Sequence, residues 1–126
     1  MEIRVEGLVG EAADFVTFTS SLGQAWGRWC GKGVPSVGNH TVEFDVPGVI
    51  ESWSEVEGAA AIVGDYRDGI VLVRGVIESV DEDGVAGLRV GTDVLLIDVP
   101  QNAERVRVGM VVEFTAEQID IYPYFV

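Results

Sequence analysis

Basic residues, cysteine and long apolar runs are all scarce in this chain of 126 residues. Only 8 Lys and Arg stand against 21 Asp and Glu, so the formal net charge is −13 at pH 7. A field of this sign repels nucleic-acid phosphates and anionic membrane surfaces, and it attracts cationic partners. No apolar run approaches the roughly 20 residues that a membrane-spanning helix needs, so we expect no membrane insertion.

Cysteine chemistry and targeting signals are equally limited. Cys30 is the single cysteine and cannot form an internal disulfide, so nothing indicates an oxidising compartment. The first six residues alternate apolar and charged side chains and do not form the apolar core of a signal peptide. We therefore expect a cytoplasmic protein.

The residue patterns of common catalytic and cofactor sites are missing as well. His40 is the only histidine, and neither it nor Cys30 lies in a motif that would orient a nucleophile and a base. Gly31–Gly33 is too short for a phosphate loop, and no zinc-ligand spacing occurs. The acidic run Asp81–Asp83 lacks the calcium-loop pattern and is typical of a hairpin tip. The sequence therefore predicts a non-catalytic protein without cofactor or metal ion, although no carboxylate pair can be singled out or dismissed.

Apolar and polar residues alternate with period two along much of the chain. The pattern is clear over Ile3–Glu6 and Val42–Val46, and it is typical of strands with one buried face. More continuous apolar runs over 70–80 and 94–99 predict central strands. The 16 glycines and turn signals such as Asp83-Gly84 suit tight hairpins and barrel corners. We expect an all-β fold with closed or partly open barrels and very little helix.

The chain is short enough for a single compact β domain over residues 1–126, and its 48% hydrophobic content can supply a core. Within it we distinguish two half-barrels, 1–57 and 70–126, joined by a short linker, 58–69. Short helical turns are expected near 57–62 and 101–105. Residues 22–29 have apolar residues at helical spacing, but Gly23 and Gly27 favour a loop or irregular strand over a short helix there.

An internal similarity indicates a duplicated β-meander. Residues 37–47 align without gaps on residues 90–100, with identical Val, Gly, Asp, Val and Pro at matching positions. In both segments a Gly turn leads into a strand that ends at Pro, which cannot donate to a ladder. Duplication and convergence on a common turn–strand pattern both remain open.

The order of elements from about residue 70 to residue 124 resembles the OB-fold, a five-stranded Greek-key barrel. The residues that carry the resemblance are Val71–Ile77, Ala86–Gly91, Val94–Val99 and Val108–Phe114. The usual helix between the third and fourth strands is reduced to 101–105. The resemblance implies an OB-like second half, and such barrels often bind nucleic acid or other ligands.

The whole chain also resembles a group of small, acidic bacterial β proteins. The shared features are an N-terminal strand, a tryptophan-bearing loop, and the strand Val42–Pro47 (VEFDVP) followed by Trp53. Some such proteins are encoded beside secreted toxins and act as immunity proteins. The resemblance implies a binding role and carries over no functional residue.

The stretch GQAWGRWCGKG, residues 23–33, combines two of the three tryptophans with the only lysine and has no acidic residue. Trp26 and Trp29 could stack on bases while Arg28 and Lys32 neutralise phosphates; packing of the tryptophans in the core is the alternative. Because two cations are few against the net charge, we do not expect nucleic acid as the partner.

The leading hypothesis is a module that binds a basic protein, such as an immunity protein that neutralises a cationic nuclease toxin. Electrostatic steering would bring the partner in, and occlusion of its cleft would inactivate it. Trp53 lies between Glu51 and Glu55 and is a candidate hot spot, because Trp is enriched at such positions; its alternative role is to cap the core. The candidate partner-binding residues are Glu51, Trp53, Glu55, Glu57, Asp65, Asp68, Asp81, Glu82 and Asp83.

Two other functions stay open. One is an OB-like nucleic-acid or ligand module that uses the loop of Trp26, Arg28, Trp29 and Lys32. The other is a structural or oligomer-forming subunit, joined through edge strands such as the C-terminal segment Ile121–Val126. The large apolar residues of that segment should pack on the barrel or on another chain.

Overall fold

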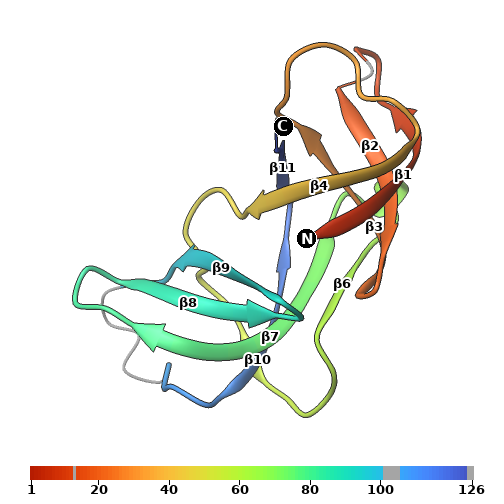
Figure 1. Cartoon of the computed structure of the whole chain (residues 1–126). Helices are drawn as coiled ribbons and strands as arrows, with labels where there is room; N and C mark the ends of the chain where they lie inside the picture. The colour runs from red at the N-terminus through yellow and green to blue at the C-terminus, as the bar shows by residue number, and fades with distance from the viewer. Residues whose placement is uncertain (13, 101–105, 125–126) are drawn as a thin grey trace.

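The computed structural model describes residues 1–12, 14–100 and 106–124 and is nearly all β (Figure 1). The strands are β1 Glu2–Val9, β2 Phe15–Ser20, β3 Gly23–Trp29, β4 Gly38–Asp45, β5 Ser54–Glu55, β6 Ala61–Val63, β7 Val71–Val80, β8 Val85–Val90, β9 Asp93–Asp98, β10 Val111–Ala116 and β11 Asp120–Pro123. A 3-10 turn, η1 (Tyr66–Asp68), is the only helical segment among these residues. The predicted all-β class is confirmed. The helical turn expected near 57–62 is wrong, because β6 begins there, and the one expected at 101–105 lies outside the described residues.

A closed barrel is formed by β1, β2, β3, β11 and β4, in that order around its wall. β1 pairs antiparallel with β2 and with β4, which closes the ring. β11 crosses from the second sheet and lies between β3 and β4, parallel to β3 and antiparallel to β4 (Figure 1). Gly27 permits this insertion, because a Cβ at that position would lie 2.9 Å from the Ile119 carbonyl oxygen and from Ile121 Cδ1. The C-terminal strand is therefore packed within the barrel wall, while residues 125–126 lie outside the described chain.

The second sheet has the order β5-β10-β7-β8-β9, with β6 also paired to β7. Its two ends are connected by the segment Val49–Glu55. Val49 forms a parallel bridge with Asp98 of β9, and the Ile50 N–H donates to the Asp98 carbonyl at 2.7 Å. At its other end this segment forms β5, which pairs antiparallel with β10. The second sheet is thus a partly closed barrel.

The two sheets repeat the same pairings. The antiparallel pairs β1–β2, β2–β3 and β1–β4 of the first correspond to β7–β8, β8–β9 and β7–β10 of the second. Both first strands carry a bulge at the same register. In β1 it follows Val5, which is opposite Phe18, and in β7 it follows Ile77, which is opposite Leu88. This register makes Val5 the counterpart of Ile77 and Phe18 the counterpart of Leu88.

Backbone hydrogen bonds outside the strands follow the same repeat. The Trp29 N–H donates to the Asp14 carbonyl, and the Val99 N–H donates to the Gly84 carbonyl, both at 2.8 Å. The last element of each set is exchanged between the halves. β11 follows the second set of strands but completes the first barrel, whereas Val49–Glu55 follows the first set but completes the second.

The closed barrel contains residues 2–45 together with 120–123, so a strand from the second half of the chain completes it. The expected linker, 58–69, contains β6 and η1. Its backbone connects the two sheets, since the Ile62 N–H donates to the Leu22 carbonyl at 3.1 Å while β6 pairs with β7.

The internal similarity between 37–47 and 90–100 is not the structural repeat. It aligns β4 with β9, and these strands hold different places in their sheets. The pairings instead match β4 with β10 and β3 with β9. The shared pattern therefore reflects a local preference, in which a glycine turn leads into a strand that ends at a proline.

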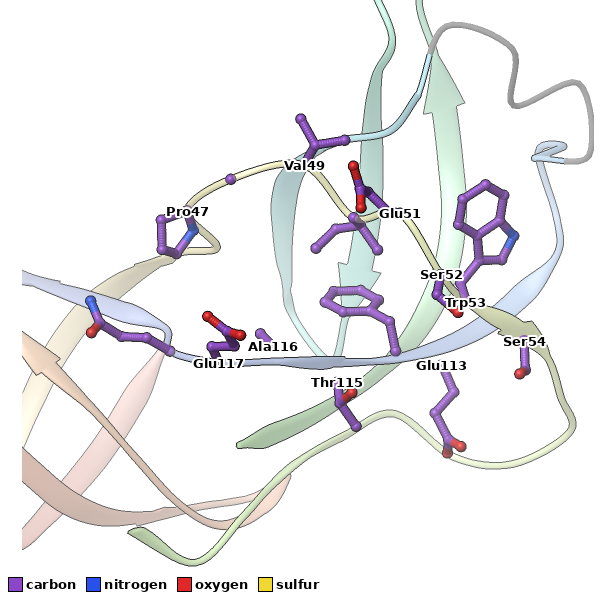
Figure 2. A pocket seen from close by; sticks show the side chains of 14 residues that line it. Pro47, Val49, Glu51, Ser52, Trp53, Ser54, Glu113, Thr115, Ala116 and Glu117 are labelled. Atoms are coloured by element: carbon purple, nitrogen blue, oxygen red, sulfur yellow. The ribbon is translucent and has the colours of Figure 1, made fainter. Parts of the chain in front are cut away.

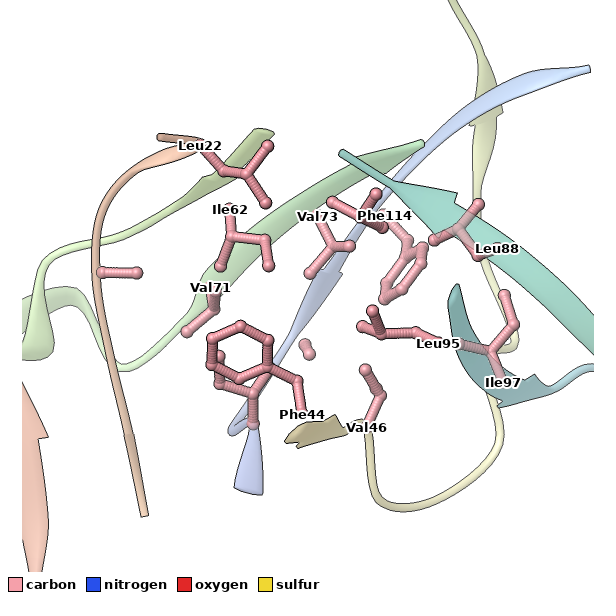
Figure 3. Packing of buried hydrophobic residues seen from close by; sticks show 14 of the residues in the cluster. Leu22, Phe44, Val46, Ile62, Val71, Val73, Leu88, Leu95, Ile97 and Phe114 are labelled. Carbon is pink, nitrogen blue, oxygen red and sulfur yellow. The ribbon is translucent and has the colours of Figure 1, made fainter. Parts of the chain in front are cut away.

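One continuous hydrophobic core joins the two sheets (Figure 3). Inside the closed barrel, Phe18 and Phe44 stack with ring centroids 5.5 Å apart. Leu88 and Ile97 supply the corresponding interior of the second sheet, and both are buried. Because burying each such side chain contributes roughly 1.5–3 kcal/mol, the shared core holds the two sheets in a fixed relation.

Candidate functional site

A groove of about 900 Å³ lies beside β10 (Figure 2). One wall is the loop that leads into β5, and the other is β10 with the residues that follow it. The lining residues are Pro47, Gly48, Val49, Ile50, Glu51, Ser52, Trp53, Ser54, Glu113, Phe114, Thr115, Ala116, Glu117 and Gln118. Its volume lies in the range of ligand-binding clefts.

The groove opens because the segment Val49–Glu55 leaves β10 early. β5 pairs with Val112 and Glu113 only, and no described residue continues the ladder toward Ala116 on that side. The N–H and C=O groups of an antiparallel strand point alternately to its two sides. The Val56 N–H donates to the Val111 carbonyl at 3.0 Å, so Val111, Glu113 and Thr115 direct their backbone groups toward the groove side. Thr115 is therefore the first β10 residue whose backbone faces the open groove.

The groove combines an apolar floor with acidic rims. Ile50 and Phe114 are buried, and half-buried Trp53 packs against the core beside them. Glu51 and Glu117 are exposed on opposite walls. This arrangement can hold an elongated group that is apolar on one side and positively charged on the other.

A third carboxylate of the groove is already paired. Glu113 Oε1 accepts from Arg74 Nε at 2.9 Å, and Arg74 also donates to the Ala59 carbonyl at 3.3 Å. This ion pair connects β10 to β7 and to the chain after β5. Glu113 therefore contributes less free negative charge than the two exposed rim carboxylates.

The structure brings together only part of the predicted partner-binding set. Glu51 and Trp53 lie in the groove, and Glu55 in β5 and Glu57 after it follow along the same segment with exposed side chains. Glu82, at the tip of the β7–β8 hairpin, is exposed and does not line the groove.

Two of the other predicted acids, Asp65 and Asp81, stabilise their own turns. Asp65 caps η1 by accepting from the Arg67 N–H at 2.9 Å, and hydrogen bonds from Arg67 lower the pKa of this carboxyl. Asp68 is the last residue of η1. Asp81 Oδ1 accepts from the N–H groups of Asp83 and Val85, at 2.8 and 3.0 Å, and so shapes the hairpin turn. These residues lie outside the groove.

The tryptophans of the stretch 23–33 pack on the barrel in two different places. Trp26 is buried at 4% exposure, donates from Nε1 to the Ile70 carbonyl at 3.0 Å, and meets the Tyr66 ring edge-on with centroids 5.2 Å apart. Trp29 is half-buried and lies 5.1 Å from the His40 ring. The two indoles therefore form no common stacking platform for bases.

The cations of that stretch are not gathered into one site either. Arg28 donates to Asp120 from Nε and Nη2, both at 3.3 Å, and Gln118 Nε2 donates to the same carboxylate at 2.7 Å. The hydrogen bonds with Asp120 are the main cause of the raised pKa of Arg28. This pair ties β3 to β11, and only Lys32 extends from the exposed loop beyond β3.

Cys30 and His40 do not form a nucleophile–base pair. His40 Nε2 lies 2.7 Å from the Ser36 carbonyl oxygen, and Cys30 Sγ lies 3.6 Å from the Arg28 carbonyl oxygen. Within residues 1–12, 14–100 and 106–124, no three His, Cys, Asp or Glu side chains cluster as metal ligands. No helix in this part of the chain is long and apolar enough to cross a membrane.

Sequence reasoning missed the β10 wall of the groove. In the sequence, Thr115 and Glu117 lie at the end of an ordinary alternating strand pattern, and no local pattern indicates that they form an open edge. Only the long-range pairing of β10 with β5 reveals it. Comparisons of the chain with protein-family models, curated proteins and solved structures found no match.

Proposed function

We propose that the chain is a non-catalytic binding module that recognises a basic protein partner through the groove beside β10. The observation that carries this proposal is the groove itself, with exposed Glu51 and Glu117 on its rims around half-buried Trp53. An aromatic anchor surrounded by charges is typical of interface hot spots. The net charge of −13 adds long-range attraction of a cationic protein.

Neutralisation of a toxin is the role that best uses these properties. A cationic nuclease presents a basic cleft, and an acidic protein that covers the cleft blocks access of the nucleic acid. Complementary charge raises the association rate, and a buried aromatic slows dissociation. We therefore favour an immunity protein against a basic toxin such as a nuclease.

An OB-like ligand module is the second candidate, and the closed five-stranded barrel favours it. The residues that would bind the ligand give less support, because Trp26, Arg28 and Trp29 lie in strand β3 rather than in a loop. In addition, Trp26 is buried and Arg28 is paired with Asp120. Binding of a single-stranded oligonucleotide that weakens with salt would support this candidate over the first.

The proposed function is tested by capturing partners on the immobilised chain, identifying them by mass spectrometry, and titrating the purified partner by calorimetry. Two charge reversals are compared. Glu51→Lys changes the groove, whereas Glu82→Lys makes the same charge change at an exposed hairpin tip. We expect a basic partner whose affinity falls at least about tenfold in Glu51→Lys and much less in Glu82→Lys.

Two results would contradict the proposal. If repeated captures recover no basic partner, the proposed function is refuted. An equal loss in both variants would show that net charge alone attracts the partner, and the groove would then have no special role.

A further inference from the structure

We propose that the groove receives an extended, lysine- or arginine-bearing segment of the partner as an added strand on β10. This inference rests on the proposed function, because it specifies how the basic partner is held. Strand addition to an open sheet edge gains affinity from main-chain hydrogen bonds and specificity from alternate side chains. The open edge supplies the main-chain hydrogen-bonding groups, and the apolar floor and the acidic rims select the side chains.

The repeat within the molecule shows what normally occupies this position. Arg4 and Val76 are counterparts, and they pair with Asn39 of β4 and Val111 of β10. The same register continues along both strands and makes Thr115 the counterpart of Glu43. It also makes Glu117, just after β10, the counterpart of Asp45.

In the first barrel, this part of the edge is covered. β11 pairs with β4 over the four residues Val42, Glu43, Phe44 and Asp45. In the second barrel, the corresponding residues of β10 face the groove, because the segment Val49–Glu55 pairs with β10 at Val112 and Glu113 only. The open length is therefore that of a short strand for which the first barrel provides a direct example.

The backbone of β10 is suited to a new partner on this side. The Ile77 N–H donates to the Met110 carbonyl at 2.8 Å, so Met110 faces β7. Because the backbone groups alternate sides along the strand, Phe114 and Ala116 also direct their N–H and C=O groups toward β7. Thr115 directs its N–H and C=O to the groove, and its side chain is exposed. An added strand antiparallel to β10, collinear with β5, would pair with Thr115 without disturbing the existing ladder.

The chemistry of the walls indicates the side chains of the added strand. Residues that point inward meet Ile50, Trp53 and Phe114, so they should be apolar. Residues near the rims meet Glu51 and Glu117, so they should be basic. The preferred segment therefore alternates basic and apolar residues, which is also the pattern of a half-buried strand.

The experiment uses the whole chain and the capped peptide Lys-Val-Lys-Val-Lys-Val as the probe. Amide hydrogen exchange is followed by NMR with and without the peptide. We expect the Thr115 amide to exchange rapidly in the free protein and at least about tenfold more slowly in the complex. The Ala116 amide is the internal control, because it already faces β7 and should change little.

Two N-methylated peptides test the main-chain bonds directly. One carries N-methyl groups on the valines and the other on the lysines, so each blocks the donors of one strand edge and keeps every charge. One of them should bind about tenfold more weakly than the unmodified peptide. Glu51→Lys should weaken binding of the unmodified peptide more than Glu82→Lys does.

The outcomes separate this inference from the proposed function. Peptide binding with an unprotected Thr115 amide, or with no effect of either N-methylated form, overturns strand addition and leaves a charge-based binding module. Capture of a basic partner without any peptide binding likewise overturns the inference alone. If neither the peptide nor a basic protein binds, both proposals fail.

Discussion

The two sheets have the same strand pairings, yet the first forms a closed barrel and the second is open along part of β10. In the first, β11 pairs with β4 over four residues and with β3 on its other side. In the second, the corresponding segment touches β9 at Val49 and β10 only from Ser54 onward. The groove is thus the gap in an incompletely closed barrel. The closing segment and β10 form it without any element that the first barrel lacks.

The difference can be traced to how each closing segment fits. β11 lies close to β3 because Gly27 leaves space for Ile121, and its Asp120 accepts from Arg28. The segment before β5 instead places Trp53 over the core, where it lines a small apolar void with Phe114. A large indole beside β10 favours a segment that stands away from the strand.

The largest expected effect comes from removing a large side chain from either end of the shared core. Phe18→Ala should lower the free energy of unfolding by about 3–5 kcal/mol, and Leu88→Ala, its counterpart, by about 2–5 kcal/mol. Because each barrel contains a segment from the other half, both should unfold together in either variant. Urea titration followed by NMR signals of Val5 and Ile97 checks this, and separate midpoints would contradict a shared transition.

Closing of the first barrel should depend on Gly27. Gly27→Ala places a Cβ 2.9 Å from the Ile119 carbonyl oxygen and from Ile121 Cδ1, so it should cost about 1–3 kcal/mol of unfolding free energy. Gly7→Ala is the matched control, because its added Cβ would be 3.5 Å from Thr17 Oγ1, an ordinary contact. Chemical denaturation measures both, and equal losses would show that the insertion of β11 is not the sensitive step.

The comparison can be sharpened by amide exchange in the free protein. The Glu43 and Asp45 amides face β11, whereas Thr115 faces the groove. We expect the two β4 amides to exchange more slowly than Thr115, by on the order of a hundredfold. Similar rates would mean that the second barrel is closed in solution.

The smallest expected effect concerns a hydrogen bond at the edge of the first barrel. Tyr124 Oη donates to Glu43 Oε1 at 2.5 Å, which raises the pKa of the tyrosine above its ordinary value of about 10. The contribution to stability is present below pH 10 and is lost as pH rises through the raised pKa. Glu43→Gln should lower this pKa toward that of free tyrosine, as followed by NMR of the Tyr124 ring. An unchanged titration would contradict the assignment.

Local features of the fold could be predicted from the sequence, because they depend on neighbouring residues. The alternation at Val42–Val46 and the Asp83-Gly84 turn gave correct strands and a correct hairpin. The exchange of closing segments could not be predicted, because β11 and β3 are far apart in the chain and their parallel pairing leaves no local signal.

The candidate site was predictable to a similar extent. Trp53 and Glu51 stand out because an aromatic residue among carboxylates is unusual, and the groove contains both. The opposite wall, which contains Thr115 and Glu117, could not be predicted. It is a strand edge that β5 leaves unpaired, and this pairing is not visible in the local sequence. Trp26 was ambiguous in the sequence, since its buried contacts with Tyr66 come from a distant turn.

The position of β11 also bears on the order in which the chain can fold during synthesis. Residues 2–45 emerge first, but β3 and β4 have no strand between them until residues 120–123 have left the ribosome. Until then both edges are free to pair with other chains, a state that favours aggregation. Formation of the first barrel therefore has to wait for β11, and crowded expression should reduce the yield of folded protein more than a chain of this size would suggest.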